Sequence, residues 1–132
     1  MVKEDVFKGL DKAQVKDMSM EEFLPLIKAR ERRTLARLNQ NPRLKQLMET
    51  VRRVKKENPQ KMIKTHCREA VILPEWLGLT FGIYSGKEFK KVEITVKHLG
   101  KRLGDFSHST GRVMHSGPGV GATRGSKFVP LK

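Results

Sequence analysis

Residues 85–109 decide the fold expected of this chain, and they read S-G-K-E-F-K-K-V-E-I-T-V-K-H-L-G-K-R-L-G-D-F-S-H-S. The dipeptide Ser85-Gly86 predicts a two-residue hairpin turn, because glycine accepts the positive φ that such turns require. Residues 89–97 then alternate apolar and polar side chains, which predicts a strand with one face on the core and one charged face. Gly100 or Gly104 is expected to close a short helical turn. The stretch therefore predicts a small fold that presents basic side chains on a fixed backbone.

Two further strands are predicted upstream of this stretch. Residues 69–73 form a short apolar run that stops at Pro74, and residues 79–84 are rich in strand formers. Together with residues 89–97 they predict a three-stranded sheet.

Two basic helices are predicted before the sheet. Ser19 and Glu22 have the spacing of a capping box, which predicts a helix start, although Pro25 then delays or bends the first turn. Asn41 and Pro42 suit the cap and first position of a second helix, which is expected to end at Asn58. The fold class is therefore α+β, a small three-stranded sheet with a short helix, preceded by two basic helices and followed by an extended tail. The expected divisions are an N-terminal helical extension (1–63), an α+β core (64–110) and an extended basic tail (111–132).

Charge is the dominant feature of the composition. Among 132 residues, 28 Lys and Arg stand against 14 Asp and Glu, for a net charge of +14. Residues 28–56 alone hold eleven bases and two acids, so few partners exist for pairing along the helices. Phosphate oxygens would supply the missing anions, which favours nucleic acid as the ligand. The opening, residues 1–27, is slightly acidic and suits a docked arm.

The location is expected to be intracellular. No apolar run approaches the roughly 20 residues that span a bilayer, and the first ten residues alternate charged and apolar side chains unlike a signal peptide. The single cysteine, Cys67, cannot form an intrachain disulfide, which agrees with a reducing compartment.

Catalytic and metal sites are not indicated. The soft ligands have no metal-binding spacing, and the glycine-rich run at residues 117–123 lacks the ending of a phosphate-binding loop and has no expected strand before it. We therefore expect no cofactor, no metal and no catalytic residues. The candidate soft ligands are His66, Cys67, His98, His108 and His115.

Basic residues around the sheet are the candidate RNA contacts. They lie before the first predicted strand, in the helical turn and after it, and they are Lys64, His66, Arg68, Lys101, Arg102, His108, Arg112 and His115. Mixed with backbone glycines, they suit phosphates and sugars of folded RNA, whose deep major groove resists reading by side chains. Arg124 and Lys127 extend the set into a tail without any acid. Shape-specific binding of structured RNA is the expectation.

The spacing S-G-K-x(6)-I-x(4)-L-G-x-x-L-G-D-F-x-x-S across residues 85–109 resembles the signature of small-subunit ribosomal protein nineteen, called protein fifteen in the eukaryotic scheme. Residues 64–66, Arg68 and residues 72–75 are similar to the lead-in of that family. The tail segments 117–123 and 128–132 resemble its archaeal and eukaryotic form.

The resemblance implies a non-catalytic constituent of the cytoplasmic small ribosomal subunit that serves translation. It implies binding to the 3′ major (head) domain of small-subunit rRNA, a place beside small-subunit ribosomal protein thirteen, and a tail directed toward the decoding region and the A-site tRNA. By motif it also adds Lys87, at the hairpin, to the rRNA contacts. Neither a membrane nor DNA is an expected partner.

Two other functions remain open at the level of the residues. A free-standing nucleic-acid chaperone or DNA-coating protein would have a similar composition. A small basic enzyme acting on RNA would need His66, His108 or His115 as its general base.

Overall fold

The computed structural model describes residues 6–112 as an α+β fold, which confirms the predicted class. Four α-helices come first: α1 (Lys12–Lys16), α2 (Met20–Phe23), α3 (Ala29–Ala36) and α4 (Pro42–Glu57). The strands are β1 (Ile63–Thr65), β2 (Thr80–Tyr84) and β3 (Phe89–Glu93). Five 3₁₀ turns connect them: η1 (Leu24–Leu26), η2 (Leu38–Gln40), η3 (Pro74–Trp76), η4 (Val96–His98) and η5 (Leu103–Phe106).

The sheet is mixed, with strand order β1-β2-β3. β1 pairs parallel to β2 with Ile63 opposite Phe81, and β2 pairs antiparallel to β3 with Phe81 opposite Val92. Because side chains alternate along a strand, these residues share the core face, while Lys64 and Lys91 lie in register on the other face with Gly82 between them. The order leaves β1 as an edge strand.

The first strand was predicted in the wrong place. Residues 70–73 form an apolar run because they are buried in the core. They are not a strand of the sheet, however, and they pair with the loop at residues 100–104 through single bonds such as Ile72 N–H to Lys101 O, 2.9 Å. Only one isolated bridge results, between Val71 and Arg102. The real strand, Ile63–Thr65, lies a few residues before the predicted one.

The hairpin loop is longer than predicted, and the third strand is shorter. Tyr84 pairs with Phe89, so the loop has four residues rather than two, and Ser85 N–H donates to Glu88 O at 2.9 Å. Gly86 has a φ of 105°, as the turn prediction required. β3 ends at Glu93 because its partner strand begins only at Thr80.

The first predicted helix is divided in two. The capping box at its start is confirmed: Glu22 N–H donates to Ser19 Oγ at 3.3 Å and Ser19 N–H to Glu22 Oε2 at 3.0 Å. Pro25 lacks an N–H to continue the α-helical pattern, and the chain tightens there into η1. α3 starts afresh at Ala29.

The second predicted helix is confirmed as α4, with Pro42 in its first turn and Asn58 as its C-cap. Leu44, Leu47, Met48 and Val51 are its buried face. The expected side-chain cap is absent: Asn41 Oδ1 accepts no first-turn N–H, while its Nδ2 donates to Glu69 Oε1 at 3.0 Å.

The short helix expected after the third strand is a pair of 3₁₀ turns. η4 is followed by Gly100 with a φ of 70°, whereas Gly104, inside η5, has no positive φ. Gly104 is needed for space: a Cβ there would lie 3.0 Å from the carbonyl oxygen of Arg68.

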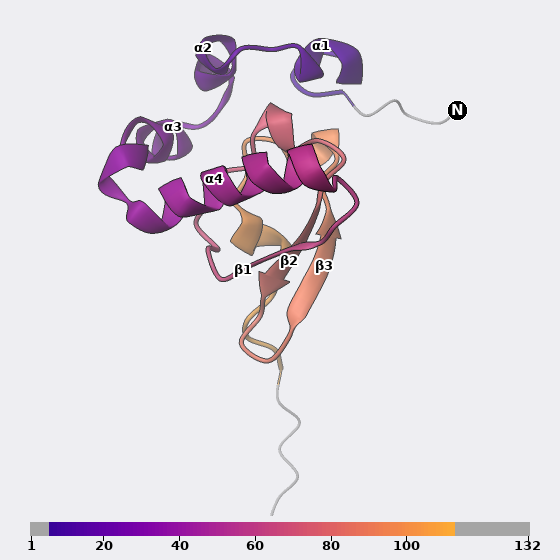
Figure 1. Ribbon diagram of the computed structural model, residues 1–132. Helices are drawn as coiled ribbons and strands as arrows, with labels where there is room; N and C mark the ends of the chain where they lie inside the picture. Colours follow the sequence, from indigo (N-terminus) through magenta and orange to yellow (C-terminus); the bar gives the residue numbers. More distant parts are fainter. Residues whose placement is uncertain (1–5, 113–132) are drawn as a thin grey trace, which may run out of the picture.

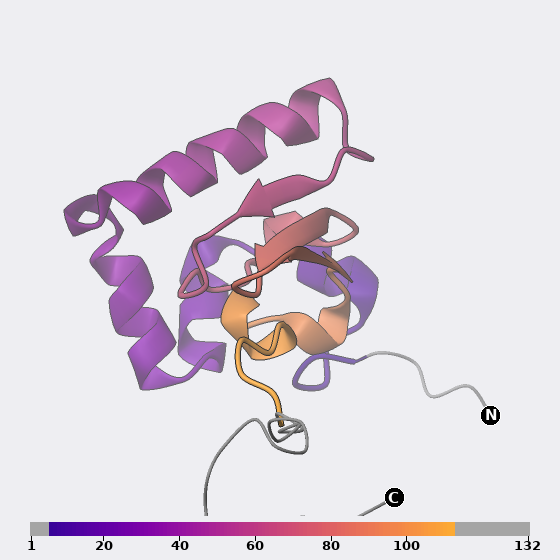
Figure 2. The same cartoon turned by 90° about the horizontal axis from the view of Figure 1, so that it is seen from below.

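One core joins all these elements. Figure 1 shows α4 crossing in front of the strands, with α1 and α2 at the end away from the β2–β3 hairpin. Figure 2 shows α4 on one side of the strands and η4 and η5 on the other. The acidic opening docks on this core through Val15, which is fully buried, and Phe7, whose ring centroid lies 6.0 Å from that of Phe23. Among residues 6–112, no helix has the length and apolar character needed to cross a bilayer.

Candidate nucleic-acid interface

An open cleft lies between α4 and the chain that leaves β1. We call it the α4–β1 cleft: its lining is residues 64–69 together with Arg43, Gln46, Leu47 and Thr50 of α4, and its volume is about 780 Å³. Figure 2 shows α4 on the side of β1 away from β2, so the unpaired edge of β1 faces the helix. The cleft therefore combines an exposed strand edge with the first half of a basic helix.

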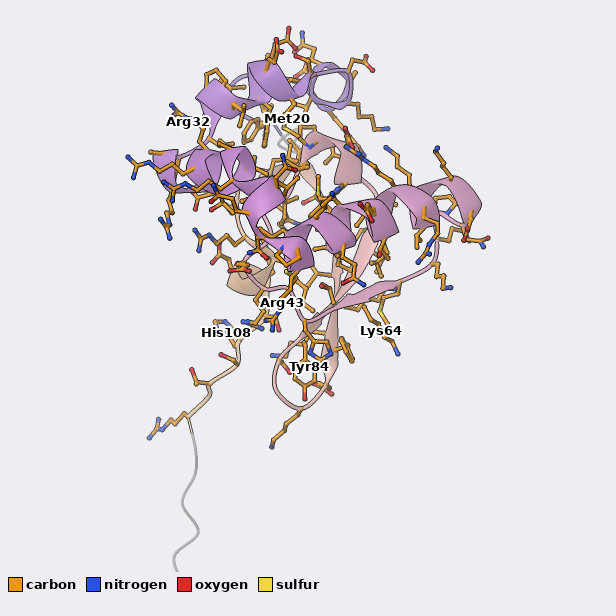
Figure 3. All side chains as sticks on the ribbon, turned by 60° about the vertical axis from the view of Figure 1, so that its left-hand side comes forward. Met20, Arg32, Arg43, Lys64, Tyr84 and His108 are labelled. Atoms are coloured by element: carbon orange, nitrogen blue, oxygen red, sulfur yellow. The ribbon has the colours of Figure 1, made fainter. Side chains whose placement is uncertain are left out.

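Positive charge dominates the lining of this cleft. Arg43 and Lys64 are exposed bases on its two sides, and His66 is exposed beside them. Glu69 is the acid of the lining, and its Oε1 accepts from Asn41 Nδ2, which fixes the start of α4 to this segment. Figure 3 places Arg43, Lys64, Tyr84 and His108 toward the hairpin end, away from Met20. A polyanion would meet several bases together at this end.

Three rings meet at His66, which belongs to the cleft lining. The His66 ring centroid lies 4.5 Å from that of Tyr84 and 5.2 Å from that of Phe89, and Tyr84 and Phe89 are 5.2 Å apart. Lys64 Nζ lies 5.5 Å from the Phe89 centroid, within cation–π range. Tyr84 Oη donates to Gly86 O at 2.8 Å, which fixes the orientation of its ring. We call His66, Tyr84 and Phe89 the ring cluster.

Cys67 is a half-buried residue of the lining and is not poised as a nucleophile. Burial raises the pKa of its thiol, and Glu69 raises it further, although Arg43 acts in the opposite direction. The thiol therefore stays protonated at neutral pH, and the thiolate is the reactive form.

Arg68 differs from the other candidate contacts, because its guanidinium is used inside the protein. Its Nη1 donates to Tyr84 O at 2.6 Å, and its Nη2 donates to Gly104 O at 3.0 Å and to Ser107 O. These bonds join the end of β2 to η5 and to the residue after it. Arg68 therefore shapes the wall of the cleft, and its contact with RNA stays a prediction.

Lys101 and Arg102 are separated from the cleft by the ladder between residues 68–72 and 100–104. Lys101 is exposed, with Nζ 5.8 Å from the Phe106 ring centroid. Arg102 Nε lies 3.5 Å from Glu31 Oε1, which ties α3 to this turn and partly neutralises the arginine. Lys101 is thus the freer charge of the two.

The remaining candidates lie on the hairpin, on the chain after η5 or beyond it. Lys87 is exposed in the hairpin loop, and His108 and Arg112 are exposed after η5. Lys90 Nζ donates to His108 O at 3.5 Å, which holds that segment beside β3. His115, Arg124 and Lys127 lie outside the described residues.

The helices add a second basic surface. All eleven bases of residues 28–56 occupy exposed positions. Two of them bond to backbone: Arg32 Nη2 donates to Ile27 O at 3.3 Å, and Lys55 Nζ donates to Glu75 O at 2.9 Å. Arg43 is the base that connects this surface to the cleft.

Sequence reasoning missed two parts of this site. Arg43 was noted only as one charge of a basic helix, although its place in the first turn, close to Asn41, was a usable signal. Tyr84 and Phe89 read as ordinary strand residues, and nothing local shows that His66 meets them. In the part of the chain that the structure describes, no group of three or more His, Cys, Asp or Glu side chains could hold a metal ion.

Comparison with known proteins agrees with this basic, non-catalytic surface. A model of the family described as ribosomal protein S19 matches residues 36–115. The chain is 39% identical over 130 residues to small ribosomal subunit protein uS19 of Methanococcus maripaludis, covering 96% of this chain and 80% of that protein. It is 40% identical over 129 residues to the protein of the same name from Methanococcus vannielii, covering 96% and 81%.

Proposed function

The chain belongs to the ribosomal protein S19 family and is a structural, non-enzymatic protein of the small ribosomal subunit, and on that premise we propose that it binds the 3′ major (head) domain of small-subunit rRNA. The observation that carries this proposal is the meeting of Arg43, Lys64 and His66 around one open cleft. Phosphate contacts position a protein on RNA, and this cleft offers charge on fixed secondary structure.

The proposal assigns the rRNA contacts to the hairpin end of the molecule and to the tail. It includes Lys64, His66, Lys87 and Arg43 around the cleft and hairpin, with further contacts from Lys101, Arg102, His108, Arg112, His115, Arg124 and Lys127. Arg68 supports this surface through its three carbonyl acceptors. In this proposal residues 1–63 extend the fold and contribute Arg43, residues 64–110 supply the other core contacts and residues 111–132 form the tail.

The finer parts of the proposal concern its neighbours in the subunit. A tail with Arg124 and Lys127 and no acid is suited to run along RNA. We assign it a path toward the decoding region, where it comes near the A-site tRNA. Small-subunit ribosomal protein thirteen is the proposed protein neighbour.

Sedimentation tests the proposal in cells. In a low-magnesium gradient, which separates the subunits, a tagged copy of the full chain is expected to sediment with the small subunits, because its basic surface binds their rRNA. A peak confined to the top of the gradient would contradict the proposal.

Filter binding completes this test by comparing ligands. The protein should bind a transcript of the rRNA 3′ major domain more tightly than random duplex DNA at equal salt. Electrostatic attraction alone would bind both ligands similarly, so a preference shows that the protein recognises the RNA itself. Equal affinity for the two would instead support a general nucleic-acid-coating protein.

A further inference from the structure

We propose that the α4–β1 cleft receives one unpaired nucleotide of the bound RNA, with its base stacked on the His66 ring and its phosphate held between Arg43 and Lys64. The inference rests on the proposed function, since it describes part of the same RNA surface. It adds a binding mode that the sequence did not indicate, because the basic residues alone favoured contacts to phosphates and sugars.

The size and the lining of the cleft suit a single nucleotide. Its volume of about 780 Å³ lies within the range of roughly 300 to 1,000 Å³ typical of small-molecule sites. Two exposed bases, Arg43 and Lys64, stand on α4 and on β1, so a phosphate between them would be met from both sides. The negative charge of Glu69 repels phosphate from its own part of the lining, and the bond from Asn41 holds that carboxylate in place.

The ring cluster supplies the surface on which a base can stack. His66 belongs both to the cleft lining and to the cluster, and it is exposed while Tyr84 and Phe89 are partly covered. Contacts with these two rings, at 4.5 and 5.2 Å between centroids, restrict the imidazole before any ligand arrives. A ring that is already fixed loses little freedom on binding, which favours affinity.

An unpaired base is required because a base inside a helix has both faces covered by its neighbours. Proteins that recognise single-stranded segments commonly stack such bases on His, Tyr, Phe or Trp rings. Stacking of this kind is sequence-tolerant, since every base has a π face. The cleft therefore selects RNA by the presence of an exposed nucleotide rather than by its identity.

The test uses the full chain and two single-stranded RNA pentamers that differ only at their centre. One carries 2-aminopurine there and the other an abasic ribose, so length and charge are equal. The base-containing pentamer should bind about tenfold more tightly, the effect of one stacked base, and its fluorescence should be quenched on binding. Equal affinity for the two pentamers, or no measurable binding of either, would overturn the inference.

Variants at His66 locate the effect. His66→Ala should bind both pentamers equally, whereas His66→Phe, which keeps an aromatic ring, should retain the preference. Lys12→Ala is the control: it removes an exposed side chain of α1, outside the cleft and outside the proposed contacts, and the ratio of the two affinities should stay near tenfold. A preference that survives in His66→Ala would place the base elsewhere and overturn the assignment.

Binding of the 3′ major domain transcript, measured in the same buffer, distinguishes failure of the nucleotide site from failure of the proposed function. If wild-type protein binds the transcript and yet treats both pentamers alike, the nucleotide site is wrong and the proposed function stands. If the transcript is not bound either, the proposed function fails as well.

Discussion

Replacing Arg68 by alanine is expected to destabilise the fold by about 3 kcal/mol, because three backbone carbonyls lose a charged donor. The acceptors are the oxygens of Tyr84, Gly104 and Ser107, and Ser107 is 1% exposed, so water replaces the guanidinium poorly. Each kcal/mol shifts the melting temperature by roughly 4–8 °C in a domain of 60–100 residues, so we expect a fall of about 15 °C. Thermal unfolding followed by circular dichroism measures it.

Two further variants show whether this effect comes from the carbonyl bonds. Arg68→Lys should recover only part of the lost stability, because one ammonium cannot reproduce the planar fork of the guanidinium. Arg43→Ala removes an exposed arginine of the same cleft and should change the stability by less than about 0.5 kcal/mol. If Arg68→Ala melts like wild type and binds RNA weakly, its guanidinium contacts RNA and the structural role is wrong.

Replacing Gly100 by alanine is the second large effect, about 3 kcal/mol of destabilisation. Gly100 has a φ of 70°, which costs a residue with a Cβ about 1 kcal/mol or more. The new Cβ would also lie 2.8 Å from Cγ2 of Ile27, which is buried in the core, and such overpacking costs about 1–3 kcal/mol. Urea unfolding gives the difference in free energy directly.

Gly78 is the matched control for Gly100. Its φ is 82°, and a Cβ there would meet nothing within 4 Å. Gly78→Ala should therefore show the backbone effect alone, about 1 kcal/mol. Equal losses in the two variants would mean that Ile27 yields without cost and that the N-terminal segment is only loosely docked.

The class of the fold could be predicted from the sequence because its signals are local. The capping box at Ser19, the proline that starts α4 and the alternation along β3 each act over a few residues. The position of the first strand could not be predicted, because the three residues Ile63–Thr65 are too few for their alternation to be recognised. The parallel pairing of β1 with β2 depends on burial that only the assembled core provides.

The candidate site could likewise be predicted only in part. Its charge was visible in the sequence, and so were Lys64, His66 and Lys87. The roles of Arg68 and of the ring cluster were not, because they depend on contacts between distant parts of the chain: the bonds of Arg68 span 16 to 39 residues. A fold that brings residue 66 beside residues 84 and 89 has no local signature.

The structure explains why the signature contains glycine at residues 100 and 104. Gly100 is required by its positive φ and by Ile27, whereas Gly104 is required by the backbone of Arg68 at 3.0 Å. Both lie on segments that hold the cleft wall in place. The signature of residues 85–109 therefore includes positions that the fold requires as well as proposed RNA contacts such as Lys87.

The salt dependence of binding to the rRNA 3′ major domain tests the central claim most directly. The slope of log K against log salt falls by about one for each phosphate contact removed. The double variant Arg43→Ala/Lys64→Ala should therefore lower the slope by about two. Lys12→Ala/Lys16→Ala, which removes two exposed charges of α1 instead, should leave it unchanged. An unchanged slope in the cleft variant, or an equal fall in both, would contradict the account.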